Sequence, residues 1–160
     1  LDYEGELAII IGKRGKDIPE DEADKYIFGY TIMNDVSARD FQFKDGQWTR
    51  GKGFDGFAPI GPWIVTKDEI RDPNNLYIKT WLNSEIRQNG NTSDMILKIN
   101  KIISKISMVM TLEPGDIIST GTPSGVGIFD SSGDKLIKNG DIVRIEIENI
   151  GFIKNKFIFK

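Results

Sequence analysis

The sequence contains no cysteine and no histidine. Without cysteine, neither disulfide bonds nor thiolate metal sites can form among these residues. Without histidine, imidazole is excluded as a metal ligand, general base or general acid. Any catalysis by these residues must therefore use carboxylates, lysine, hydroxyl groups, backbone amides or a metal ion held by oxygen atoms.

Long apolar runs and a basic stripe are also lacking. No run approaches the about 20 apolar residues that a membrane-spanning helix needs, and the start does not resemble a signal peptide. The 24 acidic and 21 basic residues give a net charge of -3, and the lysines are scattered. We therefore expect a cytoplasmic protein that binds neither membranes nor nucleic acids.

The chain length indicates one domain. At 160 residues and 18.0 kDa, one core can bury about two-thirds of the surface that the unfolded chain exposes. No linker-like or low-complexity segment divides the sequence, so we expect residues 1–160 to form a single domain. Because the chain starts without methionine and inside a predicted strand, we also expect an N-terminal part of the protein to precede Leu1.

Short β-patterned segments separated by glycine-rich turns dominate the sequence. Two segments instead predict helices: residues 17–29, and residues 91–110, where isoleucines repeat at helical spacing and Thr92 or Ser93 can act as the cap. The pattern predicts a mixed, mainly-β domain of the sandwich or barrel kind with two helices, and not a doubly wound parallel sheet. The predicted strands are 3–12, 30–37, 62–66, 76–83, 112–120, 138–151 and 152–160.

Three acidic residues are candidate metal ligands. Glu4 and Glu6 share one face of the first predicted strand, and Asp35 follows the apolar segment YTIM. Like charges repel more strongly away from water, so a half-buried group of this kind needs a cation. Oxygen ligands alone favour Mg²⁺, with Mn²⁺ or Ca²⁺ as alternatives. The competing interpretation is that Glu4 and Glu6 are solvated acids of an edge strand and that Asp35 is a turn or capping residue.

Arg39 and Lys52 are candidate counter-charges for these acids. They would balance a negative site and attract an anionic substrate, which an arginine can bind with two parallel hydrogen bonds. Surface ion pairs are the alternative for both residues.

The loop TGTPSGVG, residues 120–127, is a candidate ligand-binding loop. It lacks the lysine and the following helix of a phosphate-binding P-loop. Its glycines would let backbone amides and Thr122 approach a ligand, and a purely structural turn is the alternative.

Together these segments resemble the fumarylacetoacetate hydrolase family. The resemblance is carried by DYEGELAIIIG, GYTIMNDVSARDFQ, RGKGFDGFAPIGPW, NTSDM, LEPGDIISTGTPSGVG and KNGDIVRIEIENIG, which occur in the family's order and cover nearly the whole chain. It implies a β-sandwich roll, usually a homodimer, that binds Mg²⁺ or Mn²⁺ through a Glu-x-Glu pair and a later aspartate. In this sequence these ligands are Glu4, Glu6 and Asp35.

The resemblance also implies a small-molecule substrate, a 2-oxo or 2-hydroxy-enoic acid. Four residues match family positions that line the substrate site, and Lys52 is the expected catalytic residue among them. They are Arg39, Gln42, Lys52 and Thr122.

The expected activity is that of a metal-dependent enzyme acting through a metal-stabilised enolate on 2-oxo-dienoic or acylpyruvate-type acids, in the breakdown of aromatic or sugar-derived compounds. We expect similarity to 2-hydroxyhepta-2,4-diene-1,7-dioate isomerase. C–C hydrolysis of fumarylacetoacetate or acylpyruvates and oxo-acid decarboxylation are alternatives. The resemblance implies that family members of those kinds activate water with a histidine and a glutamate. This chain has no histidine, so either the pair lies in the part expected to precede Leu1, or it is lacking and isomerisation is favoured. A catalytically silent module that binds oxo-acids through a metal is a further alternative.

Overall fold

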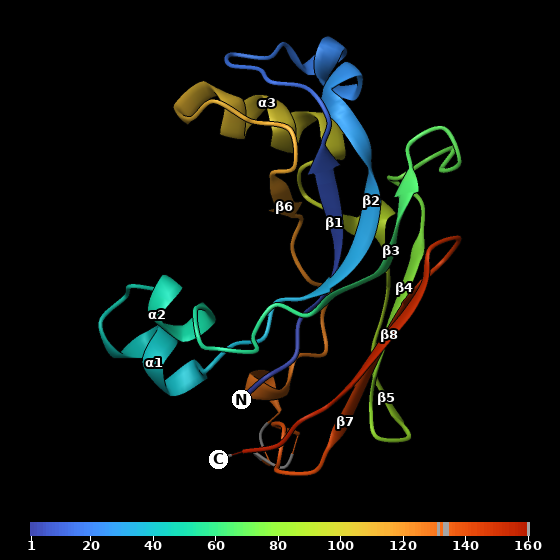
Figure 1. The fold of residues 1–160 in the computed structure, drawn as a ribbon. Coiled ribbons are helices and arrows are strands. Elements are labelled where there is room, and N and C mark those ends of the chain that lie inside the picture. Colours follow the sequence, from blue (N-terminus) through green and yellow to red (C-terminus); the bar gives the residue numbers. More distant parts are fainter. Residues whose placement is uncertain (131, 133–134, 160) are drawn as a thin grey trace.

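Two four-stranded antiparallel sheets form the centre of the molecule (Figure 1). The computed structural model describes residues 1–130, 132 and 135–159. The strand order is β3-β2-β1-β6 in the first sheet and β5-β4-β7-β8 in the second. Contacts of β1 with β4, β2 with β7 and β3 with β8 place the two sheets face to face. The predicted mainly-β sandwich is therefore confirmed.

The strands are short and mostly follow the predicted segments. In the first sheet they are β1 (Gly5–Ile11), β2 (Ile27–Asn34), β3 (Ile60–Thr66) and β6 (Ile117–Ser119). In the second they are β4 (Tyr77–Leu82), β5 (Glu85–Asn91), β7 (Ile142–Ile147) and β8 (Gly151–Lys156).

The core lies between the sheets and is built mainly from isoleucine, leucine and valine. Alternate residues of a strand point to the same face, so Leu7 and Ile9 of β1 and Ile145 and Ile147 of β7 enter this core together. β-branched residues suit such a pleated, buried surface. The apolar alternation of β1 therefore leaves Glu6 on the opposite face of the same strand.

Truncation of a core residue measures the strength of this packing. Ile145 is fully buried, so Ile145→Ala is expected to lower the free energy of unfolding by about 2–5 kcal/mol, through lost transfer energy and the cavity left behind. Ile86→Ala is the matched control, because the Ile86 side chain on β5 is 52% exposed and should cost less than about 1 kcal/mol. Urea unfolding checks both, and equal losses would contradict this assignment of the core.

The two predicted helices are present in shorter form. Residues 17–29 contain the 3₁₀-helix η1 (Glu20–Tyr26), after which the chain enters β2. Within residues 91–110 the α-helix is α3 (Ile99–Val109), and Lys98 is its N-cap. The capping prediction for Thr92 and Ser93 was wrong, because residues 92–94 form the separate 3₁₀-helix η2 (Thr92–Asp94). α3 packs against η1 beside the end of the first sheet (Figure 1).

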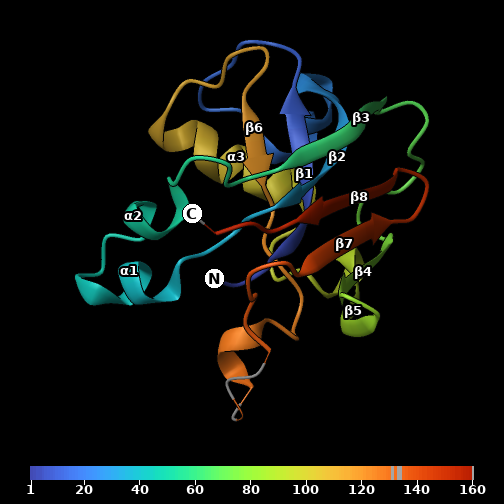
Figure 2. The same cartoon turned by 60° about the horizontal axis from the view of Figure 1, so that its bottom comes forward.

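The sequence interpretation missed β5 and two short helices. β5 pairs with β4 through a turn at Asn83, whose φ of 56° is in the left-handed region. The helices are α1 (Arg39–Lys44) and α2 (Thr49–Lys52), and both lie in the glycine-rich stretch between β2 and β3. They pack against each other and project from the sheets on the side where the N-terminus lies (Figure 2). The last 3₁₀-helix described is η3 (Gly127–Phe129). No helix in the described part of the chain has the length and apolar character required to cross a membrane.

Candidate metal centre

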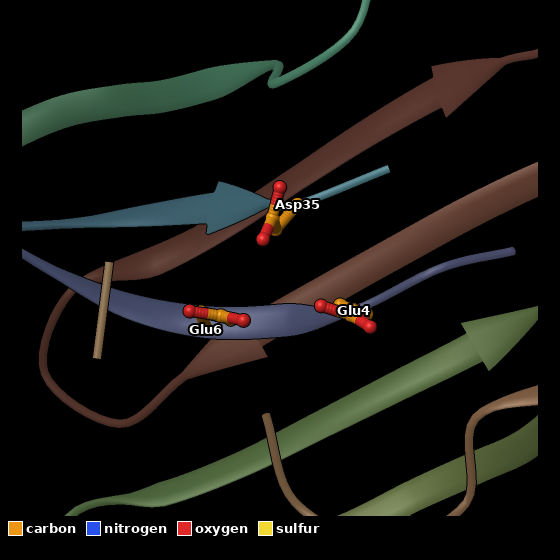
Figure 3. A group of neighbouring side chains, drawn as sticks. All are labelled: Glu4, Glu6 and Asp35. Atoms are coloured by element: carbon orange, nitrogen blue, oxygen red, sulfur yellow. The ribbon is translucent and has the colours of Figure 1, made fainter. Parts of the chain in front are cut away.

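The three candidate ligands lie together where β1 begins and β2 ends. Glu4 directly precedes β1, Glu6 is in β1, and Asp35 directly follows β2. Antiparallel pairing of β1 with β2 sets Gly5 opposite Asn34, and the Asp35 N–H donates to the Glu4 carbonyl at 2.9 Å. One carboxylate oxygen from each acid lies within 4.8 Å of the others, and the three side chains converge (Figure 3).

The alternative of solvated acids at an edge strand was wrong. β1 lies between β2 and β6, and Glu6 is only 3% exposed. Burial raises the pKa of Glu6 to about 7, although hydrogen bonds from the Ser119 hydroxyl and the Gly121 N–H oppose this shift. A carboxylate held in such a place is costly when ionised unless a cation accompanies it.

Lys52 connects two of the three acids. Its ammonium group donates to Glu4 at 2.8 Å and to Asp35 at 2.5 Å. Burial lowers the pKa of Lys52, but the hydrogen bonds and charges of Asp35 and Glu4 outweigh this effect and raise the pKa above its ordinary value. Lys52 is therefore a cation at neutral pH, placed by α2 against the carboxylates.

Arg39 contacts Glu4 from the other side. Its guanidinium group lies 2.8 Å from a Glu4 oxygen and donates to Gln42 at 2.9 Å. It also forms a two-nitrogen contact with Asp2, at 2.9 and 2.8 Å. Arg39 and Gln42 are both buried. Of these two predicted substrate-binding residues, Arg39 contacts the acids directly, and Gln42 contacts Arg39.

Thr122 lies on the loop that follows β6. Its hydroxyl donates to the Gly5 carbonyl at 2.9 Å and accepts from the buried Gln88 side chain at 2.8 Å. The neighbouring Gly121 has φ = 100°, and its N–H donates to Glu6 at 2.8 Å. The glycine-rich loop therefore directs a backbone amide at a carboxylate of the centre.

The donor set fits a hard divalent cation. All three candidate ligands offer oxygen, which Mg²⁺, Mn²⁺ and Ca²⁺ prefer. The surrounding charges agree with this choice: Asp2, Glu4, Glu6 and Asp35 oppose Arg39 and Lys52, so four negative and two positive groups leave -2 when all are ionised. A dication would neutralise the cluster.

A cavity beside the glycine-rich loop is not lined by the carboxylates. It has a volume of about 490 Å³, and Gly121, Thr122 and Pro123 line one wall, with apolar groups such as Ile78 and Met95 on others. It shares only the glycine-rich loop with the centre. A divalent cation needs oxygen ligands, and the three carboxylates supply them whereas the cavity lining does not include them. The candidate metal site is therefore at the carboxylates.

Two residues of the centre were missed in the sequence. Asp2 precedes Glu4 and Glu6 at the same two-residue spacing, which places all three acids on one side of an extended chain, and this pattern could have identified it. Ser119 binds Glu6 across the β1–β6 pairing, in which Ala8 is opposite Ser119. Nothing local in the sequence marks Ser119, because its role depends on a long-range strand pairing.

Removal of the Lys52 charge tests whether its ammonium group competes with a metal ion for the carboxylates. Lys52→Met keeps the length of the side chain but leaves Glu4 and Asp35 without their shared ammonium group. With one competing cation removed, Mn²⁺ affinity is expected to rise by about 3- to 10-fold. Titration of Mn²⁺ followed by electron paramagnetic resonance measures this affinity. An affinity that falls below that of the wild type would show that Lys52 supports cation binding instead of competing with it.

The fold and the centre define a mainly-β domain with an all-oxygen site suited to a divalent cation. Residues 1–158 match the family described as fumarylacetoacetate (FAA) hydrolase C-terminal, and the chain belongs to this family. The predicted resemblance is thus confirmed.

Relatives with several named activities are similar to this chain. A mitochondrial oxaloacetate tautomerase of Xenopus laevis is 48% identical over 160 residues, which is 99% of this chain and 50% of that protein. The solved structure of 2-hydroxyhepta-2,4-diene-1,7-dioate isomerase from Mycobacterium marinum has a TM-score of 0.89 and 50% identity, and the match covers 98% of this chain and 58% of the other. Maleylpyruvate hydrolase from Sphingobium sp. SYK-6, solved in complex with a manganese(II) ion and pyruvate, has a TM-score of 0.86 and 39% identity, with 98% and 54% covered.

The chain is shorter than these relatives. Among the curated proteins most similar to it, it spans 50–61% of the relative's length. The cytoplasmic location stays a prediction, since one relative is named as mitochondrial.

Proposed function

We propose that this chain is the catalytic domain of a divalent-metal-dependent enzyme that shifts a proton, and with it a double bond, in a small 2-oxo acid. Mg²⁺ is the proposed physiological ion, with Mn²⁺ and Ca²⁺ as alternatives. The observation that carries the proposal is the convergence of Glu4, Glu6 and Asp35 within 4.8 Å, in a cluster whose charges sum to -2 when all of its groups are ionised.

Glu4, Glu6 and Asp35 would hold the cation. When bound, the cation would supply Lewis-acid chemistry, which favours enolisation of a chelating 2-oxo acid. The chain itself fixes these ligands: Arg39 and Lys52 hold Glu4, Lys52 holds Asp35, and Gly121 holds Glu6. Such preorganisation keeps reorganisation small during the reaction.

Lys52 is the proposed catalytic residue. An ammonium group has three N–H donors, and the two carboxylates take two of them, so the third can face a bound acid. The Lys52 side chain is 21% exposed, which leaves it accessible from the solvent side. In the enol-to-oxo direction the 2-hydroxyl group loses a proton and a carbon atom gains one. Because its pKa is raised, Lys52 stays a cation, so it can pair with the substrate carboxylate and stabilise the negative charge on the 2-oxygen between these two transfers. Arg39, Gln42 and Thr122 are proposed to line the same site.

Sequence identity does not separate a proton shift from bond cleavage. Proteins named as a tautomerase and an isomerase are 48% and 50% identical to this chain, a fumarylacetoacetate hydrolase of Exiguobacterium antarcticum is 46% identical and the maleylpyruvate hydrolase is 39% identical. We place the proton shift first because these residues include no histidine that could activate water for cleavage. The two hydrolases keep the second proposal open, which is C–C hydrolysis or decarboxylation of an acylpyruvate or related oxo-acid. A metal-dependent module that binds oxo-acids without turnover is the third. We also expect the protein to act as a homodimer.

An absorbance assay distinguishes these proposals. The protein is incubated with Mg²⁺ or Mn²⁺ and, in turn, with enol oxaloacetate, an acylpyruvate and a hydroxymuconate-type diene, and pyruvate release is measured in parallel. We expect loss of the enol or diene absorbance with the metal, no change with a chelator, and no pyruvate from the acylpyruvate.

Each other outcome selects another proposal. Pyruvate released in step with the absorbance change would establish cleavage in place of a proton shift. Binding of the acids without any spectral change would indicate the silent module. Turnover that persists unchanged in excess chelator would contradict the metal-dependent proposal itself.

A further inference from the structure

Asp2 is a buried acid outside the three candidate ligands. Its side chain is completely buried, yet it accepts hydrogen bonds from several sides. One oxygen accepts from the N–H of Gly127 at 2.7 Å and from the N–H of Tyr3 at 2.9 Å. The other accepts from the N–H of Ile128 at 3.0 Å and from Arg39. A carboxylate with this many donors has a fixed position and orientation.

Asp2 reaches the centre through Arg39. Arg39 Nε and a terminal nitrogen contact Asp2, while its other terminal nitrogen lies 2.8 Å from Glu4. The Arg39 side chain is 9% exposed, so its charge is compensated mainly by these two acids. Glu4 in turn shares its second oxygen with Lys52. Asp2 therefore contacts Arg39, and Arg39 contacts Glu4.

We infer that Asp2 is a positioning residue for the metal centre, which acts by holding Arg39 so that Glu4 stays available as a cation ligand. This inference rests on the proposed divalent cation at Glu4, Glu6 and Asp35. With Asp2 neutralised, the buried Arg39 would depend on Glu4 as its remaining carboxylate and would compete with the cation for it. The net charge of the six-residue cluster would also change from -2 to -1, which weakens attraction for a dication.

The end of the glycine-rich loop, at Gly127 and Ile128, fixes Asp2. A Cβ atom at Gly127 would lie 2.9 Å from an Asp2 oxygen and 2.5 Å from the Lys135 carbonyl oxygen, so glycine is required for this close approach. Residues far apart in sequence, Asp2, Arg39 and Gly127, thereby control the position of one ligand.

The test is the affinity of Asp2→Asn for Mn²⁺, measured by electron paramagnetic resonance of free Mn²⁺. We expect the dissociation constant to rise by about 10- to 100-fold, the range found when groups behind metal ligands are replaced. Sucrose is included because it stabilises folded states, and thermal unfolding of the metal-free protein verifies that the variant is folded at the titration temperature. A purely structural role would lower the unfolding temperature but leave the dissociation constant of the folded protein unchanged.

Tyr3→Phe is the matched control. Tyr3 is the neighbour of Asp2 in the chain. Its hydroxyl donates to the Gly125 carbonyl at 3.1 Å and accepts from Arg87 at 2.9 Å, so these hydrogen bonds involve neither Asp2 nor Arg39. Its dissociation constant should stay within about 2-fold of the wild type. If Asp2→Asn does not fold even in sucrose, Gly127→Ala decides instead. Its Cβ would lie too close to the Lys135 carbonyl oxygen and to an Asp2 oxygen, so a shift of Asp2 should also raise the dissociation constant. An unchanged dissociation constant of the folded Gly127→Ala variant would overturn the inference.

The outcomes separate this inference from the proposed function. If the wild type does not bind Mn²⁺, the proposed metal centre fails. If the wild type binds Mn²⁺ and folded Asp2→Asn binds it equally well, the positioning role of Asp2 is overturned. The same holds if Asp2→Asn and Tyr3→Phe weaken Mn²⁺ binding equally.

Discussion

Replacement of Asp35 by asparagine is expected to weaken Mg²⁺ binding by at least about 100-fold, beyond the effect of changing groups behind the ligands. Asp35 offers one of the three converging carboxylates and shares the Lys52 ammonium group with Glu4. An asparagine has one weaker oxygen donor and no charge, so the cluster would hold a dication poorly. Turnover in the absorbance assay should be lost with it. Titration calorimetry with Mg²⁺ measures the binding, and Glu4→Gln is expected to behave in the same way.

Asp55→Asn is the matched control for this prediction. Asp55 is an exposed aspartate of the same stretch between β2 and β3, and it is not among the converging acids. The same chemical change there should leave affinity and turnover within about 2-fold of the wild type. If Asp35→Asn retained wild-type affinity for Mg²⁺, Asp35 would not be a ligand.

The metal-free protein is expected to lose stability as the pH rises, because of Glu6. The pKa of Glu6 is about 7 in the folded protein, against an ordinary value of 4.5, so between these values the folded state binds a proton that the unfolded state has released. The contribution of this group is therefore fully present below about pH 4.5 and is lost as the pH rises through about 7. At 1.36 kcal/mol per pKa unit, the total is about 3 kcal/mol.

Glu6→Gln should remove this dependence. The glutamine carbonyl can still accept from the Gly121 N–H, but no proton is bound or released. In the presence of a chelator, we expect the variant to be more stable than the wild type at about pH 8, by up to about 3 kcal/mol, and to show a smaller advantage at about pH 5. Urea unfolding at the two pH values gives the difference. A wild type and variant with parallel pH profiles would contradict the raised pKa.

These two predictions share a physical cause. Glu6 is placed where its ionised form destabilises the metal-free protein, and Asp35 and Glu4 add like charges beside it. A bound dication would reverse this effect, because anything that binds the folded state alone stabilises it. The centre therefore trades stability of the metal-free protein for affinity.

The strands of the two sheets could be predicted from the sequence better than the glycine-rich stretch between β2 and β3. β1 and β7 were predicted because alternating β-branched residues mark a strand with one buried face. β5 was missed because its residues, EIRQNGN, are mostly polar, and a strand at the edge of a sheet needs little apolar surface. α1 and α2 are too short for a helical period to appear, and packing against each other stabilises them instead.

The carboxylates of the centre could be predicted, but their surroundings could not. Glu4 and Glu6 are two residues apart on one strand, and Asp35 ends the next strand, so antiparallel pairing brings them together. The burial of Glu6 depends on β6, which pairs with β1 from more than a hundred residues away. The contact of Arg39 with Asp2 similarly requires the complete fold, because no local spacing relates the two residues. Arg39, Gln42, Lys52 and Thr122 stay predictions as substrate-binding residues.

The most direct test of the central claim is a crystal structure of the protein with Mn²⁺, with anomalous diffraction measured at the manganese absorption edge. We predict an anomalous peak between the carboxylates of Glu4, Glu6 and Asp35, with oxygen ligands from all three. A fully occupied Mn²⁺ ion bound elsewhere, with these carboxylates still held by Lys52, Arg39, Ser119 and Gly121, would contradict the account.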